Sequence, residues 1–309
     1  MSKLQKTIKI SSPGKIILSG EHAVVYGYPA LLASSNLRMK IEVFKDKRQK
    51  SSSYADYAFR KALSYFKVSD PKTFSYQIDS KIPVGSGMGS SAALAVGMSA
   101  LGSILSKRDW NLEEVNKLAY EIEKKQHGRP SGGDNTVVTY GGFVWYRKEA
   151  ENLKVFSQIK PKKVLPKLFV VNSGSPKETT GEMVAQVRER YQKNPEKIKK
   201  IFSQIECCTK GFLKLILNEE KIEIGDLITM NERLLEGIGI VSSQTLDLIR
   251  KLEKIKTNVK VSGAGGKLKG SGILICYHKD PKKFQNFAKS QNLDIISVSL
   301  GKNGVIKEI

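Results

Sequence analysis

A glycine-rich segment over residues 82–93 has the composition of a phosphate-binding loop. It reads Ile-Pro-Val-Gly-Ser-Gly-Met-Gly-Ser-Ser-Ala-Ala, and its glycines are Gly85, Gly87 and Gly89. Glycine permits positive φ and close approach of a ligand to the backbone, and Ser90 or Ser91 is expected to cap the helix that follows. A helix N-terminus presents free N–H groups to an anion, and serine hydroxyls can reach a Mg²⁺ ion held on phosphates. The alternative is a tight turn before a core helix, since the P-loop lysine and the dinucleotide-binding glycine spacing are both absent.

Two carboxylates further along the chain are candidates for chemistry. Asp134 follows Gly132 and Gly133 in a turn that we expect to lie just before a strand, where an ordinary turn aspartate is the competing interpretation. Glu123 lies eleven residues earlier, at the edge of the apolar stripe of an expected helix. An acid beside a buried face needs a cation, so Glu123 is either a Mg²⁺ ligand or the partner of a nearby base. The nearby bases are Lys124, Lys125 and Arg129.

A third glycine-rich segment, residues 261–266, has the sequence Val-Ser-Gly-Ala-Gly-Gly and is followed by Lys267 and Lys269. Such a run can form a nest of backbone donors for an anion. Ordinary loops use the same residues, so this segment alone decides nothing.

The elements that would position these residues follow from hydrophobic periodicity. We expect strands at 37–43, 74–78, 168–172, 259–262, 272–278 and 294–299, and a hairpin over 137–146 around Gly141 and Gly142. We expect a buried helix at 90–105, an amphipathic helix at 111–126, mainly helices from 180 to 255, and a helix at 282–291. Strands and helices mix without strict alternation, which favours an α+β fold. Two prolines and four lysines at 159–167 indicate a domain boundary.

Composition limits the class of protein. The chain has 309 residues, 40% of them hydrophobic, which is enough for a sizeable core and too much for a disordered chain. No run approaches a membrane span, the N-terminus lacks a secretory signal, and the three cysteines lack metal-ligand spacing. We therefore expect a cytoplasmic protein. The net charge of +22 leaves a nucleic-acid or anionic-membrane binder open as a rival, although the motif segments carry little of that charge.

Together these segments resemble the GHMP kinase superfamily of small-molecule kinases. Residues 13–27, Pro-Gly-Lys-Ile-Ile-Leu-Ser-Gly-Glu-His-Ala-Val-Val-Tyr-Gly, are similar to the signature of its mevalonate kinase family and are the most specific match. Residues 130–142 resemble the Pro-Ser-Gly-x-Asp-Asn block, and residues 230–246 resemble a helical segment of the family. The third loop departs from the pattern, because Lys267-Leu268-Lys269 separates glycines that are contiguous in the family.

The resemblance implies a role for each matching residue. Asp134 matches the catalytic aspartate, and Lys15 matches the lysine that contacts it. Ser91 and Glu123 match the Mg²⁺ ligands. The nucleotide-binding positions are Gly85, Gly87, Met88, Gly89, Ser90, Ser91 and Ala92. The substrate-binding positions are Lys15, Glu21, His22, Ser131, Asp134, Thr180, Gly263 and Ala264, with Thr179 placed as well as Thr180.

The resemblance also implies an activity and a fold. The activity is ATP-dependent and Mg²⁺-dependent phosphorylation of (R)-mevalonate to 5-phosphomevalonate, in isoprenoid biosynthesis. The fold has two lobes: an N-terminal nucleotide-binding lobe like ribosomal protein S5 over residues 1–165, and a ferredoxin-like lobe over 166–309. Mevalonate and ATP are the expected partners, without nucleic acid or membrane, and homodimerisation is common in the family. Phosphomevalonate, a sugar or the 3-hydroxyl of mevalonate stays open as the phosphoryl acceptor.

Overall fold

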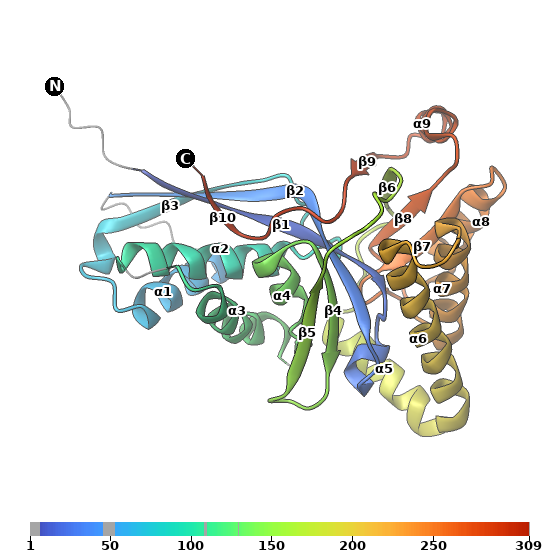
Figure 1. Cartoon of the computed structure of the whole chain (residues 1–309), viewed down its shortest axis with the longest axis horizontal. Coiled ribbons are helices and arrows are strands. Elements are labelled where there is room, and N and C mark those ends of the chain that lie inside the picture. The colour runs from blue at the N-terminus through green and yellow to red at the C-terminus, as the bar shows by residue number, and fades with distance from the viewer. Residues whose placement is uncertain (1–6, 46–52, 108–109, 129, 309) are drawn as a thin grey trace.

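The computed structural model describes residues 7–45, 53–107, 110–128 and 130–308. Within these residues the chain forms two antiparallel sheets flanked by helices (Figure 1). The expected α+β class is confirmed.

The first sheet carries the N-terminal motif. Its strand order is β10-β1-β2-β4-β5, with β3 also paired to β2. The strands are β1 (Ile8–Ser19), β2 (Ala30–Lys45), β3 (Phe74–Ser80), β4 (Phe143–Lys148), β5 (Lys154–Ile159) and β10 (Ile306–Glu308). Short 3-10 turns are η1 (Ala23–Tyr26) and η2 (Pro71–Thr73). Alternate residues of β2 such as Met39, Ile41 and Val43 are buried, because a strand that is covered on one face buries every second side chain.

Helices cover one face of this sheet (Figure 1). They are α1 (Ser53–Tyr65), α2 (Ser90–Leu105), α3 (Leu112–His127) and α4 (Gly133–Tyr140). α2 is buried over most of its length, as its small apolar residues predict. Gly97 and Gly102 permit its close packing, because an added Cβ would lie 2.6 Å from Ile41 and 2.9 Å from the Ala62 carbonyl respectively.

The second sheet has the strand order β7-β8-β6-β9. Its strands are β6 (Leu168–Asn172), β7 (Asn258–Ser262), β8 (Ile273–Tyr277) and β9 (Ile295–Val298). The helices of this half are α5 (Thr180–Lys193), α6 (Pro195–Leu217), α7 (Ile224–Ile238), α8 (Ser243–Glu253) and α9 (Pro281–Ser290). α6 also packs against β1 and β2, so Phe212 and Leu215 belong to the core of the first half. Cys207 and Cys208 lie within α6 and are free.

The expected hairpin over 137–146 is wrong. Residues 133–140 form α4, which ends at Gly141 with φ of 73°, and only β4 is extended. Val137, Val138 and Thr139 favour strands by intrinsic propensity, but all three are buried against the sheet and tertiary packing overrides that preference. As a consequence, Asp134 lies in the first turn of a helix and not before a strand.

The division into domains at residue 165 stays a prediction. β1 to β5 lie before it, and β6 to β9 lie after it. The C-terminal segment then returns to the first sheet, where β10 pairs with β1 at Lys9–Glu308. Within the described ranges, no helix is both long and apolar enough to cross a membrane.

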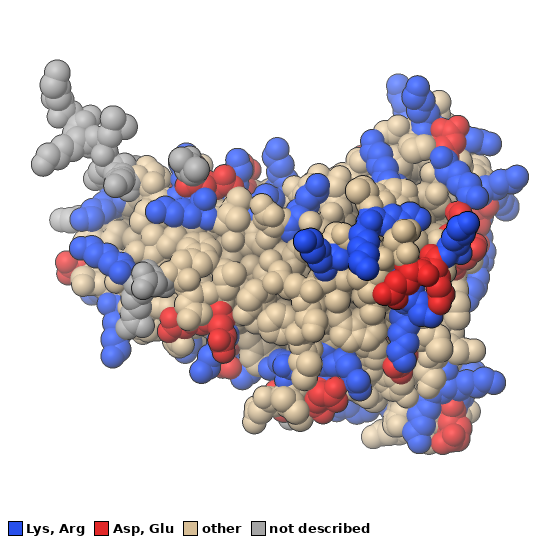
Figure 2. Space-filling view, in the orientation of Figure 1, with Lys and Arg blue, Asp and Glu red and all other residues tan. Residues whose placement is uncertain are grey.

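The basic residues are spread over the surface. Figure 2 shows Lys and Arg scattered around the visible face, interspersed with Asp and Glu, and not gathered in a single stripe. A charged groove that follows a nucleic-acid backbone is therefore not seen on this face.

Candidate active site

The glycine loop has the backbone that its sequence predicts. Gly85, Gly87 and Gly89 all have positive φ, of 68°, 88° and 75°. A Cβ on Gly89 would lie 2.6 Å from the Lys15 side chain, so only glycine fits there. The loop is docked on the second sheet, because the amide of Ile273 donates to the Ser86 carbonyl at 3.0 Å.

The helix after this loop begins differently from the prediction. Its N-cap is Gly89, and no side chain caps it, so the expected cap by Ser90 or Ser91 is wrong. The two serines and Ala92 occupy the first turn instead. The N–H groups at the start of α2 thus lack a side-chain cap, which favours an anion at this helix terminus.

Lys15 and Asp134 meet beside the loop. The Lys15 Nζ lies 3.1 Å from Asp134 Oδ2. Lys15 is buried with 3% of its side chain exposed, whereas Asp134 is 37% exposed. The Lys15 amide also donates to the Met88 carbonyl at 2.9 Å, which ties β1 to the glycine loop. The site therefore presents an accessible carboxylate held by a buried cation.

Glu123 and Ser91 lie close together in the same half of the protein. The Ser91 hydroxyl lies 3.5 Å from Glu123 Oε2 and 3.0 Å from His127 Nε2. The Tyr54 hydroxyl donates to Glu123 Oε1 at 2.8 Å. Glu123 is buried, and this burial raises its pKa to about 7. Helical periodicity placed Glu123 at the edge of the apolar stripe, and the structure buries it with 2% of the residue exposed.

The alternative to a Mg²⁺ ligand was an ion pair of Glu123 with a nearby base. No such pair with Lys124 or Lys125 is observed among the described residues. Lys124 pairs with Glu121, and the basic group within ion-pair distance of Glu123 in the described ranges is His127, whose Nε2 lies 3.8 Å from Oε2. Arg129 lies outside the described residues. Sequence reasoning missed Tyr54 and His127; the spacing of four residues on one helix is a signal for His127, whereas Tyr54 has no local signal.

Glu21 and His22 follow β1 at the boundary between the two sheets. His22 has φ of 58°, outside the favoured regions for a residue with a side chain, and its Nε2 lies 2.9 Å from the Ala264 carbonyl. Burial lowers the pKa of His22. Glu21 is buried and forms an ion pair with Lys260, so its carboxylate does not face solvent as a residue lining an open pocket would. Lys260 has a sequence signal that was missed, a lysine between two valines of a buried strand.

The remaining substrate candidates lie on two loops and one helix start. The Ser131 hydroxyl accepts from the Gly133 amide at 3.3 Å, directly before α4. Thr180 is exposed at the start of α5, whereas Thr179 is its N-cap and forms a capping box with Glu182. Gly263 lies beside the glycine loop, since a Cβ there would be 3.6 Å from Gly87 Cα.

The altered third loop is held by a carboxylate. Glu178 Oε1 accepts from the amides of Lys267 and Leu268 at 3.1 and 3.0 Å. The side chains of Lys267 and Lys269 are exposed.

Comparison with known proteins identifies a matching family and similar chains. The profile described as "GHMP kinases N terminal domain" matches residues 53–142. The mevalonate kinase of Archaeoglobus fulgidus is 35% identical over 267 residues, covering 83% of this chain and 88% of that protein. The mevalonate kinase of Pyrococcus furiosus is 32% identical and covers 90% of both chains.

Solved structures show the same fold. The Methanococcus jannaschii mevalonate kinase aligns with a TM-score of 0.79 at 25% identity, over 97% of this chain and all of that one. The L. major mevalonate kinase in complex with R-mevalonate aligns with a TM-score of 0.83 at 24% identity, over 98% and 100%. The fold is thus the two-lobed fold of the GHMP kinases, and on the strength of its relatives over most of its length the chain belongs to the mevalonate kinase family.

Proposed function

We propose that this protein transfers the γ-phosphoryl group of ATP to the 5-hydroxyl of (R)-mevalonate and releases ADP and 5-phosphomevalonate. The observation that carries the proposal is the Lys15–Asp134 pair at 3.1 Å, next to a loop of three positive-φ glycines. Its membership of the mevalonate kinase family supports the choice of substrate.

Asp134 orients the acceptor hydroxyl and takes its proton. Its carboxylate is accessible and lies in the first turn of α4. Lys15 holds this carboxylate in place and offsets the charge that develops as the oxygen attacks phosphorus. Phosphoryl transfer depends mainly on such positioning and charge neutralisation.

The nucleotide phosphates bind over the glycine loop. The backbone of Gly85, Gly87, Met88 and Gly89 approaches the phosphates without side-chain obstruction, and the first turn of α2, from Ser90 to Ala92, supplies uncapped N–H groups. His22, Ser131, Thr180, Gly263 and Ala264 are proposed to contact the acceptor. Glu21 is proposed to act indirectly, because it is buried.

Ser91 and Glu123 fit a Mg²⁺ ion. Their oxygens lie 3.5 Å apart, and Glu123 is a buried carboxylate without a lysine or arginine within ion-pair distance in the described part of the chain. That part has no group of three or more His, Cys, Asp or Glu placed to hold a metal. This agrees with Mg²⁺, which uses few protein ligands and completes its shell with phosphate and water. When bound, it supplies neutralisation of phosphate charge.

The deciding experiment measures ADP release with mevalonate, phosphomevalonate, galactose and homoserine as acceptors. We expect mevalonate to have the highest kcat/KM. A higher value with another acceptor, or ADP release that does not depend on any acceptor, contradicts the proposed substrate. Tight DNA binding at about 150 mM salt without kinase activity favours the basic-binder alternative instead.

The metal assignment has its own variant. Glu123→Gln should raise the Mg²⁺ concentration needed for half-maximal rate by about tenfold or more, with a smaller change in the KM for mevalonate. A change confined to mevalonate binding contradicts the assignment. A cytoplasmic location and a homodimer stay predictions, to be checked by fractionation and by sedimentation.

A further inference from the structure

A buried ion pair joins the two sheets behind the proposed active site. Lys260 of β7 contacts the Glu21 carboxylate, and the exposed fractions of the two side chains are 0% and 1%. The Lys260 Nζ also donates to the Ile17 carbonyl at 3.1 Å. One lysine of the second sheet therefore contacts the chain at two points, Ile17 and Glu21, that follow Lys15 closely in sequence.

The hydrogen-bonding capacity of this pair is only partly used, unlike that of a contact that serves stability alone. Glu21 Oε2 is buried without a hydrogen-bond partner, and so is Oε1 of the neighbouring Glu232. Moving charges out of water is costly, and apolar residues of similar size often stabilise a protein equally well. A costly pair at this place, between the two sheets and close to Lys15 in sequence, points to a role in positioning.

The segment that Lys260 contacts contains an unfavourable backbone conformation. It runs from Ile17 through Gly20 to His22, which has φ of 58° and lacks a side-chain cap for the turn that follows. The Ile17 amide donates to Ser262 Oγ at 3.0 Å, and His22 Nε2 lies 2.9 Å from the Ala264 carbonyl. All three supports come from β7 and the loop directly after it, so the second sheet holds this segment in addition to its pairing with β2 of the first sheet, at Ile17–Leu32 and Ser19–Leu31.

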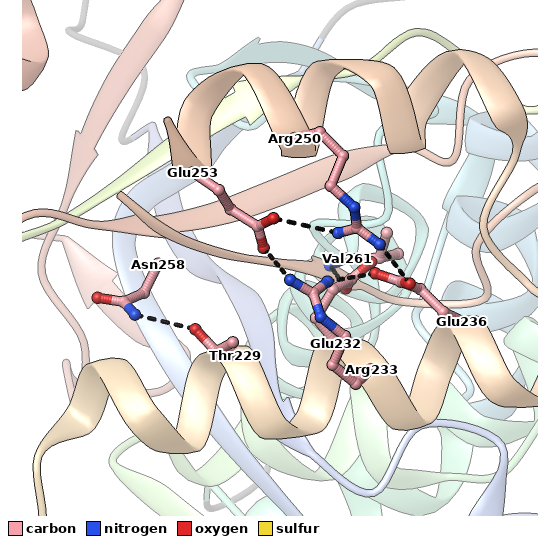
Figure 3. A network of polar contacts seen from close by, with 8 residues as sticks. All are labelled: Thr229, Glu232, Arg233, Glu236, Arg250, Glu253, Asn258 and Val261. Carbon is pink, nitrogen blue, oxygen red and sulfur yellow. Dashed lines mark hydrogen bonds and ion pairs between the residues drawn. The ribbon is translucent and has the colours of Figure 1, made fainter. Parts of the chain in front are cut away.

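β7 is itself held by hydrogen bonds to α7 (Figure 3). The Val261 amide donates to Glu232 Oε2 at 2.7 Å, and the Asn258 amide group donates to Thr229 Oγ1 at 2.9 Å. Both acceptors belong to α7. Ion pairs of Arg233 and Arg250 with Glu236 and Glu253 then join α7 to α8. Lys260 therefore projects from a strand that has little freedom to follow β1 if β1 moves.

We propose that Lys260 is a positioning residue for phosphoryl transfer. It holds Glu21 and the Ile17 carbonyl so that the end of β1 and the His22 turn keep their place, and Lys15 stays paired with Asp134. Lys260 is too deeply buried to touch substrate. The inference rests on the proposed kinase activity.

The test uses the double variant Glu21→Gln/Lys260→Met, which removes both charges of the pair, keeps both side-chain lengths and leaves neither member of the pair as an unpaired buried ion. Folding is followed by circular dichroism and thermal unfolding, and kinetics by ADP release with saturating mevalonate and ATP. Lys9→Met is the matched control. It removes an ion pair with Glu42 at 2.8 Å that also involves β1, but whose side chains are 48% and 40% exposed.

We expect the double variant to fold and to lose at least about tenfold in kcat, with the KM for ATP within about twofold of the unaltered protein. The control should keep its kcat. Lys260→Arg, which retains the cation, should recover part of the rate. A double variant whose kcat and KM for mevalonate both stay within twofold overturns the proposal.

If the double variant does not fold, Glu21→Gln alone provides the comparison. It removes the charge that pairs with Lys260, and a kcat equal to that of the unaltered protein overturns the proposal there also, because the ion pair is then not needed to keep Lys15 paired with Asp134. Failure of the unaltered protein to release ADP with mevalonate is a different result, because it contradicts the proposed function and not the role of Lys260.

Discussion

Two lysine–carboxylate pairs involve β1 and the residues that follow it, and they differ in access to water. Lys15 and Asp134 are 3.1 Å apart, with 37% of the Asp134 side chain exposed. Lys260 and Glu21 are both closed to solvent. The cation is buried in both pairs, so the exposure of the carboxylate is what distinguishes them.

This difference in exposure suits the Lys15–Asp134 pair to the reaction and the Lys260–Glu21 pair to positioning the chain. An exposed carboxylate can meet a substrate hydroxyl and exchange a proton, because its charged form is hydrated and needs no rearrangement. A buried carboxylate depends on its cation for compensation, and it transmits a loss of that cation to the backbone around it. The open pair is thus expected to control rate, and the closed pair to control stability and alignment.

The largest effect is expected from breaking the closed pair on one side. Lys260→Met leaves the Glu21 charge buried and unpaired, which should lower the free energy of unfolding by about 3–5 kcal/mol. Urea denaturation measures this loss. A loss below about 1 kcal/mol, comparable with that of the exposed Lys9→Met control, would show that the closed pair is no different from a surface pair.

The open pair should respond in rate instead. Asp134→Asn keeps an oxygen to accept from Lys15 but removes the proton acceptor, so kcat should fall at least about 100-fold. Urea denaturation of the same variant should show a much smaller change than Lys260→Met. Near-normal turnover in a folded Asp134→Asn protein would refute the assignment of the base.

The neighbour of the closed pair should make stability depend on pH. Burial raises the pKa of Glu232 from its ordinary value near 4.5 to about 7. Between these values the unfolded chain releases a proton that the folded protein keeps, so Glu232 lowers the free energy of unfolding as pH rises from about 4.5 to about 7.

Glu232→Gln removes this titration and should stabilise the protein, relative to the unaltered chain, by about 1–3 kcal/mol more at pH 8 than at pH 5. Thermal unfolding at the two pH values measures the difference. An equal effect at both values would mean that Glu232 does not titrate as its burial implies.

The smallest effects are expected from alanine substitution of the adjacent Thr179 and Thr180, which should differ in whether stability or activity falls. Thr179→Ala removes the N-cap of α5 and should cost about 1 kcal/mol of stability, with activity retained. Thr180→Ala should leave stability unchanged and lower kcat/KM for mevalonate. The reverse pattern would assign the active-site role to Thr179.

Much of the architecture follows from local patterns in the sequence. The helix at 90–105 and the strands at 168–172 and 259–262 were predicted within a residue or two, because each has a clear apolar periodicity and clear ends. Residues 137–139 were misjudged, since β-branched residues favour a strand wherever packing does not intervene. α1, β5 and β10 have weaker periodicity or are short, and the pattern did not indicate them.

The same distinction holds at the site. The sequence alone was sufficient to find features that depend on contiguous residues. These are the glycines of the phosphate loop, the place of Glu123 beside an apolar helix stripe, and the resemblance that singles out Asp134. The contacts of Tyr54 with Glu123 and of Lys260 with Glu21 join residues 69 and 239 positions apart. Spacing along the chain carries no information about such pairs, because only the packing of the elements brings them together.

The sequence by itself therefore determined which residue types are available for phosphoryl transfer and some of the elements that present them, such as the helix after the glycine loop. The tertiary structure decided which lysine faces which carboxylate, and which of the two carboxylates remains open to a substrate. The physical reason is desolvation: the free energy of a charge depends on what surrounds it in space, and the two halves of the chain create those surroundings only when they pack against each other.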